Sequence, residues 1–337
     1  MRRRHRFATA TLIMVRMLAT DPLLADPPEK PPRLPIESDA STESDDEGFD
    51  PTGDVDQIPS WSNVRKLPGE LSEISGLVWA EDRPDRVYAH NDSGDTPTFY
   101  AIDQNGRILD RISLRGARHV DWEDAFLTRW NDQTQLWAAD IGDNLARRSE
   151  VVIYAIDLPA TNPRETSNST KVRQVQPRSE IRLRYPDGPR DCEAIAFDPR
   201  TNQVVMIAKT PFPWSRLYAA SLSEDDIGPD ATRSVTRSSM KTLRYVGNLA
   251  VPMVTALDIH PRSGRWLVVN YFHAFVFSPR GTGERDAGEP EIWKQTPLTI
   301  PLPDMRQVEA ACWGQDNRVI IAGEGSPPLW AKSGTIR

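Results

Sequence analysis

Short apolar stretches that alternate with polar residues recur along this 337-residue chain from Glu73 onward. Their apolar positions repeat with a period of two, which is typical of β-strands, and no stretch keeps a period of 3.6 for three turns. The 29 Pro and 19 Gly residues match the many tight turns that short strands need. The pattern therefore predicts an all-β fold built of hairpins.

One hairpin pattern occurs five times: an acidic or polar residue, an apolar strand, a turn and a second apolar strand. The five hairpins occupy residues 73–92, 123–143, 193–210, 255–272 and 309–325. A third apolar strand follows each hairpin, and a more polar fourth strand is expected at 108–114, 180–185, 242–247 and 291–298. Four-stranded units at intervals of 50 to 70 residues predict the blades of a β-propeller.

The fifth unit lacks a fourth strand, whereas an unassigned strand at 63–71 precedes the first unit. We expect this N-terminal strand to complete the last blade, because closing the ring also protects the strand edges. The prediction is five four-stranded blades within 61–337. Six blades are the alternative, if a further unit lies within 155–190 or 220–250.

The residues before the propeller form two segments of opposite charge. Residues 1–25 hold five Arg and one Asp around an apolar stretch, which predicts an export signal, with a basic leader on a cytoplasmic protein as the alternative. This stretch is too short and too interrupted for a membrane span. Residues 26–60 hold eleven acidic residues and many Pro, which predicts a disordered linker. The remaining 61–337 are nearly neutral and lack a basic stripe, so nucleic-acid binding is not expected.

Candidate chemistry gathers at one predicted mouth of the propeller channel, where the innermost strand of each blade begins. The first residues of these strands form a predicted ring of Glu73, Glu123, Glu193, Thr255 and Glu309. The ends of the second strands add Asp92, Asp95, Asp140, Asp143, Asn144, Lys209, Asn270 and Glu324. Like carboxylates raise one another's pKa, and Ca²⁺, which takes about six to eight oxygen ligands, would relieve the repulsion. Compensation by Lys209, or by Arg118, Arg190 or Arg306 on the entering loops, is the alternative to a metal ion. Alternatively, each ring Glu caps backbone N–H groups of the neighbouring blade and binds no ligand. The opposite face is expected to carry only hairpin turns.

Three motifs resemble a family of exported bacterial β-propellers in the phytase-like and esterase-like group: DWED at 121–124, DIGDN at 140–144 and DCEAIAFDP at 191–199. The resemblance covers roughly 61–337 and implies a calcium-assisted propeller that acts on phosphoesters. It would place the functional core at Glu123, Asp124, Asp140, Asp143, Asn144, Asp191, Glu193 and Lys209. Thr255 in place of a ring Glu, and five units in place of the six blades of propeller phytases, depart from that family.

These residues support two main hypotheses for function, each with a monomeric protein. In the first, the protein hydrolyses a small phosphorylated or ester substrate, Glu123 or Asp124 acts as the base, and Lys209 stabilises negative charge. The Ca²⁺ ligands would come from Glu73, Asp92, Asp140, Asp143, Asn144, Asp191, Glu193 and Glu309. In the second, a non-catalytic propeller binds a protein or glycan at the cell surface, using the aromatic loop TPFPWS at 210–215. A glycosidase with two carboxylates is disfavoured, because the acids recur by repeat symmetry.

Overall fold

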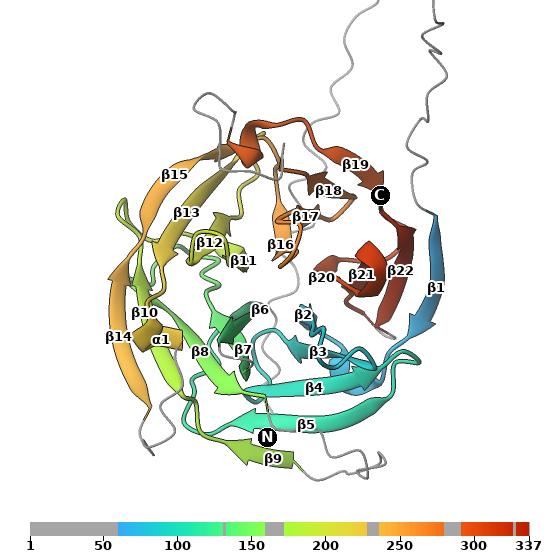
Figure 1. Ribbon diagram of the computed structural model, residues 1–337, viewed down its shortest axis with the longest axis horizontal. Helices are drawn as coiled ribbons and strands as arrows, with labels where there is room; N and C mark the ends of the chain where they lie inside the picture. Colours follow the sequence, from blue (N-terminus) through green and yellow to red (C-terminus); the bar gives the residue numbers. More distant parts are fainter. Residues whose placement is uncertain are drawn as a thin grey trace, which may run out of the picture. The chain divides into compact units, whose positions relative to one another are not determined.

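The computed structural model describes residues 60–130, 133–158, 172–227, 236–279, 291–325 and 328–336. Five sheets surround one central axis, which confirms the predicted five-bladed β-propeller (Figure 1). The innermost strands are β2 (Ile74–Trp79), β6 (Trp122–Trp130), β11 (Cys192–Asp198), β16 (Val254–Ile259) and β20 (Val308–Trp313). Each packs against the innermost strands of both neighbouring blades, including β20 against β2, so the ring is continuous. The segments expected to form an export signal and a linker, 1–25 and 26–60, lie outside the described residues except for Ser60.

Each blade continues outward with three more antiparallel strands. In the first two blades these are β3 (Arg86–Asn91), β4 (Thr98–Asp103) and β5 (Ile108–Leu114), then β7 (Gln133–Asp140), β8 (Val151–Asp157) and β10 (Ser179–Arg184). In the next two they are β12 (Gln203–Ala208), β13 (Ser215–Ser221) and β15 (Arg244–Leu249), then β17 (Trp266–Asn270), β18 (His273–Phe277) and β19 (Leu298–Pro301). The fourth strand expected at 291–298 is therefore shifted to β19. A 3-10 turn at Ile292–Lys294 precedes it, and Trp293 of this turn stacks on Trp266 with the ring centroids 5.8 Å apart.

The fifth blade confirms the predicted closure of the ring. It consists of β20, β21 (Arg318–Gly323), β22 (Leu329–Thr335) and the N-terminal strand β1 (Trp61–Lys66), which pairs antiparallel with β22. The indole Nε1 of Trp61 also donates a hydrogen bond of 2.7 Å to the carbonyl oxygen of Pro301 in the fourth blade. The closing strand lies slightly earlier than the expected 63–71, because residues 69–71 form a 3-10 turn that buries Leu71.

Two blades carry an additional outer strand that the sequence pattern did not indicate. β9 (Val172–Val175) pairs in parallel with β5, and β14 (Arg237–Thr242) pairs in parallel with β10 (Figure 1). Each of these strands lies in the chain between two strands of one blade but pairs with the outermost strand of the preceding blade. The stretches in which a sixth blade could have been hidden, 155–190 and 220–250, therefore supply edge strands instead.

The core lies between the blades, because both faces of each sheet are covered by a neighbour. Strand β7 shows the rule: Leu136 and Ala138 pack toward the first blade, whereas Trp137 and Ala139 pack toward the third. Side chains alternate between the two faces of a strand, so a strand that is buried on both faces reads as a continuous apolar run. No helix within the described ranges is both long and apolar enough to cross a membrane.

Candidate functional site

A β-bulge near the start of every innermost strand sets the ring of side chains at one end of the axis. In each blade the pairing with the second strand skips one residue, and the skipped residues are Ser75, Glu123, Glu193, Thr255 and Glu309. A bulge bends the strand and redirects the side chain it contains. The ring position of the first blade is thus Ser75, and the expectation for Glu73 was wrong by two residues. Such a shift preserves the period-two pattern, so alternation alone does not detect it.

The two hydroxyl members of this ring connect neighbouring blades. Ser75 Oγ donates to the carbonyl oxygen of Glu123 at 2.6 Å, and Thr255 Oγ1 donates to that of Val308 at 2.9 Å. The three glutamates behave differently. Within the described ranges their carboxylates accept no backbone N–H; the donors are Ser75 Oγ for Glu123 (3.1 Å), Lys209 Nζ for Glu193 and Tyr271 OH for Glu309 (3.1 Å). The structure therefore does not support the capping alternative for these glutamates.

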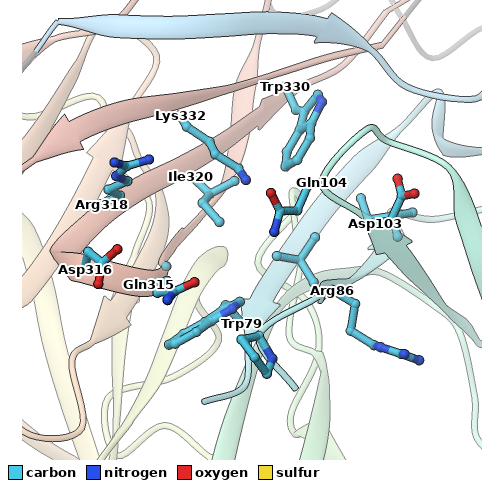
Figure 2. A pocket seen from close by; sticks show the side chains of 14 residues that line it. Trp79, Arg86, Asp103, Gln104, Gln315, Asp316, Arg318, Ile320, Trp330 and Lys332 are labelled. Atoms are coloured by element: carbon cyan, nitrogen blue, oxygen red, sulfur yellow. The ribbon is translucent and has the colours of Figure 1, made fainter. Parts of the chain in front are cut away.

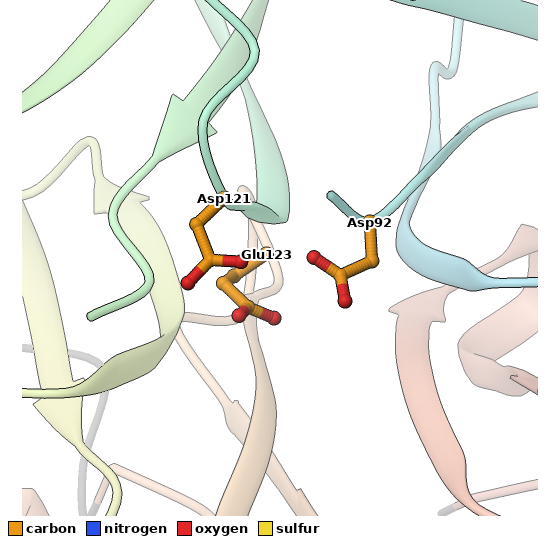
Figure 3. Close-up of side chains that lie close together, drawn as sticks. All are labelled: Asp92, Asp121 and Glu123. Carbon is orange, nitrogen blue, oxygen red and sulfur yellow. The ribbon is translucent and has the colours of Figure 1, made fainter. Parts of the chain in front are cut away.

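Three carboxylates from two blades, Asp92, Asp121 and Glu123, converge at this end and are called the acidic trio below. One oxygen of each lies within 4.8 Å of the others, and Figure 3 shows Asp92 facing Asp121 and Glu123 from the neighbouring blade. No site role was predicted for Asp121 from the sequence. Its position two residues before Glu123 is the signal that could have indicated it, because residues two apart share one face of a strand.

Gly142 provides the space that the acidic trio occupies. A Cβ atom at this position would lie 2.5 Å from Asp121 Oδ2 and 2.5 Å from Glu123 Oε1. The backbone N–H of Gly142 donates a hydrogen bond to the carbonyl oxygen of Asp121. The equivalent backbone hydrogen bond in three other blades is donated by Asp92, Lys209 and Glu324. The second blade thus has no side chain where three other blades carry a charged one. The Gly in the DIGDN motif is explained by this close approach.

Burial raises the pKa of all three trio members. The pKa of Glu123 is raised well above its usual value by burial and by the nearby carboxylates of Glu193, Asp92 and Asp121, while Lys209 lowers it. Burial and the same kind of repulsion raise the pKa of Asp92 to about 7, against the hydrogen bond from Ser93, and burial raises the pKa of Asp121. No Lys or Arg nitrogen of the described chain lies within 4.0 Å of these carboxylates. The raised pKa values favour bound protons or a bound cation over a fully ionised cluster.

The other side of this end carries its own charge network. Lys209 pairs with Glu193 and donates a hydrogen bond of 2.8 Å to Tyr271, whose hydroxyl donates to Glu309. Glu324 lies beside Glu309, and burial together with that neighbour raises the pKa of Glu324 to about 9. Lys209 therefore balances charge within the ring, and its role in catalysis stays a prediction.

Four other predicted ligands shape the loop after β7 rather than joining the acidic trio. Asp140 is fully buried and pairs with Arg148 at 2.8 Å. Asp143 Oδ2 accepts the backbone N–H of Arg148 at 2.6 Å, and the Asp143 N–H donates to Asp191 Oδ1 at 3.1 Å. Asn144 is exposed. These contacts fix the loop that carries Gly142.

Asp124 lies below the acidic trio and binds backbone groups of three blades. Its Oδ1 accepts the N–H of Ala125 at 2.8 Å, and its Oδ2 accepts those of Ile195 at 3.0 Å and Leu257 at 3.2 Å. Its side chain is fully buried; burial raises its pKa, and the three amides lower it. The carboxylate predicted as a possible base is thus engaged in joining β6, β11 and β16.

The opposite end of the axis was expected to carry only hairpin turns, but it also contains a cavity. A cavity of about 160 Å³ there is bordered by the ends of all five innermost strands. A smaller hollow of about 90 Å³ lies between the fifth and first blades. Figure 2 shows Lys332 and Gln104 of this hollow extending toward each other between Trp330 and Trp79.

No protein-family model matches this chain, and no curated protein sequence matches it. Among solved structures, a glucose dehydrogenase is 9% identical over 81% of this chain and 100% of that chain, with a TM-score of 0.42. The PQQ-bound form of aldose sugar dehydrogenase from Streptomyces coelicolor is 10% identical over 82% of this chain and 99% of that one, with a TM-score of 0.41. A chain of the mitotic checkpoint complex is 15% identical, with a TM-score of 0.33; the match covers 77% of this chain and 63%, less than two thirds, of that one. At such identities the likeness concerns the fold alone.

Proposed function

We propose that this protein is an exported β-propeller that binds a calcium ion at its acidic trio and hydrolyses a small ester or phosphoester there. The observation that carries the proposal is the convergence of Asp92, Asp121 and Glu123 without a cationic partner in the described ranges. The DWED and DIGDN motifs, which resemble those of phytase-like propellers, contribute Asp121, Glu123 and Gly142 to this end.

The chemistry of the acidic trio suits a hard divalent cation. Ca²⁺ prefers carboxylate and carbonyl oxygens, and three carboxylates form the anionic half of a typical coordination shell. The space left by Gly142 lets two of these carboxylates face the third. A bound cation would compete with protons for these carboxylates, whose pKa values are raised, so binding is expected to release protons.

The side chains around the acidic trio would support hydrolysis of an ester or phosphoester. A divalent cation at the acidic trio would polarise an ester or phosphoryl oxygen and lower the pKa of a water molecule. Glu123 can accept a proton there, because its raised pKa increases its affinity for one. Lys209 uses two of its three N–H donors on Glu193 and Tyr271, which leaves one for an anionic group of a substrate.

Turnover of simple esters is the direct test of the hydrolytic part of this proposal. The full chain is incubated with para-nitrophenyl acetate and para-nitrophenyl phosphate, in Ca²⁺ and in excess chelator. We expect turnover of one substrate to be at least about tenfold faster in Ca²⁺, and to be lost in Glu123→Gln. Glu73→Gln is the matched control, because this exposed acid lies outside the bulge ring. Equal turnover with and without chelator, or none in either condition, would remove hydrolysis from the proposal.

A second candidate, a non-catalytic binding module, is favoured by one observation. Five of the exposed large apolar side chains lie on loops at the same end as the acidic trio: Val120, Leu145, Phe212, Trp214 and Phe272. Phe212 and Trp214 stack on each other with the ring centroids 5.8 Å apart. Exposed aromatic groups around a polar centre are typical of surfaces that bind a protein or a sugar. Calcium binding without any turnover would favour this candidate.

A further inference from the structure

Aromatic side chains contribute to the wall of the cavity at the opposite end of the axis. Its volume is about 160 Å³, and Trp79, Phe126, Phe197 and Trp313 contribute to its wall from four different innermost strands. For comparison, an apolar cavity of about 150 Å³ accommodates a benzene molecule. The cavity is therefore large enough for a compact ligand of this size.

One carboxylate in this wall has no cationic partner in the described part of the chain. Asp258, near the end of β16, accepts the backbone N–H of Trp313 at 2.7 Å. Burial raises its pKa to about 6, while the amides of Trp313 and Ile259 lower it, so the group is ionised at neutral pH. The carboxylate thus places a negative charge beside aromatic rings.

The other charged groups of the wall already have partners. Glu81 pairs with Arg262 at 2.9 Å, and Asp82 pairs with Arg83 at 3.6 Å. Arg129 is exposed and engaged in a contact of its own. Burial lowers the pKa of His260, which keeps its imidazole neutral at pH 7. Asp258 therefore decides the charge that a ligand of this cavity must carry.

We propose that this cavity binds a small organic cation of the alkylammonium type, with its charge against Asp258 and its alkyl groups against Trp79, Phe197 and Trp313. Aromatic faces attract ammonium groups, and the carboxylate of Asp258 adds a direct charge interaction. An anion would be repelled by Asp258. A neutral apolar ligand would cover the carboxylate without compensating its charge, which is unfavourable.

Calorimetric titration of the full chain with choline tests this proposal, and the neutral molecule of the same shape, 3,3-dimethylbutan-1-ol, is the matched ligand. We expect choline to bind at least about tenfold more tightly than the neutral alcohol. Asp258→Asn is expected to reduce choline affinity at least about tenfold and to leave the affinity for the alcohol unchanged. The Asn side chain retains an oxygen that can accept the Trp313 N–H, so the fold should persist.

Three further variants keep the test independent of folding and of the acidic trio. Trp79→Leu, at a partly exposed position of the wall, should weaken choline binding, whereas Asp316→Asn, an exposed acid at the same end, should not. Glu123→Gln should leave choline affinity unchanged, because the acidic trio lies at the other end. The proposal is overturned if choline and the alcohol bind with equal affinity. It is also overturned if the Asp258→Asn protein is as stable as wild type and binds choline with the wild-type affinity.

Discussion

Replacing Asp124 with Ala is expected to lower the free energy of unfolding by about 3–6 kcal/mol. The carboxylate satisfies the buried N–H groups of Ala125, Ile195 and Leu257, which belong to three blades. Each buried amide that loses its acceptor costs about 1–3 kcal/mol. The summed cost for the three amides is reduced, because the variant no longer buries a carboxylate. Urea unfolding followed by circular dichroism measures the loss.

Two comparisons make this expectation specific. Asp124→Asn keeps one acceptor oxygen and should lose less stability than Asp124→Ala. Asp85→Ala removes an acid whose side chain is 60% exposed and pairs with Arg86, and it should cost no more than about 1 kcal/mol. An Asp124→Ala protein as stable as Asp85→Ala would show that the carboxylate does not hold the blades together.

Glu123→Gln, in contrast, is expected to raise the free energy of unfolding by about 1–3 kcal/mol in excess chelator at pH 8. Without a cation, each carboxyl of the acidic trio must either take up a proton on folding or be ionised beside the others, and the neutral amide removes this cost at one position. Its oxygen can still accept the hydrogen bond of Ser75 Oγ. Thermal unfolding in chelator, for wild type and variant side by side, measures the difference.

The pH dependence of that difference follows from the raised pKa values. Asp92 has a pKa of about 7 in the folded protein and an ordinary value of 3.8. The folded state therefore holds more protons than the unfolded state between about pH 4 and 7, so this group's contribution to stability declines as pH rises through that window. The advantage of Glu123→Gln should accordingly be larger at pH 8 than at pH 5. An advantage that is equal at both pH values would contradict the assigned repulsion.

The blades could be predicted from the sequence because their faces are all buried in the same way. Runs such as the one around Leu136 and Trp137 are apolar on both sides of the strand, and polar turns separate them. The strands β9 and β14 could not be predicted in this way. They are short, half exposed and polar, and their pairing depends on an edge that the preceding blade offers.

The sequence indicated at which end of the propeller the candidate site lies, but not which residues form it. The repeat placed Glu123, Glu193 and Glu309 correctly at one end, since each follows the same pattern of strand starts. The bulge that brings Ser75 rather than Glu73 into the ring leaves no mark on the alternation. The engagement of Asp124 by amides of distant strands is a tertiary contact, so spacing along one strand could not reveal it.

A calcium titration of the chelator-treated full chain by calorimetry addresses the acidic trio most directly. We expect one site per chain that releases protons on binding, and an affinity at least about tenfold lower in Glu123→Gln. Glu73→Gln should bind as wild type does. No heat of binding in wild type, or equal binding in wild type and Glu123→Gln, would contradict the assignment of the acidic trio as a cation site.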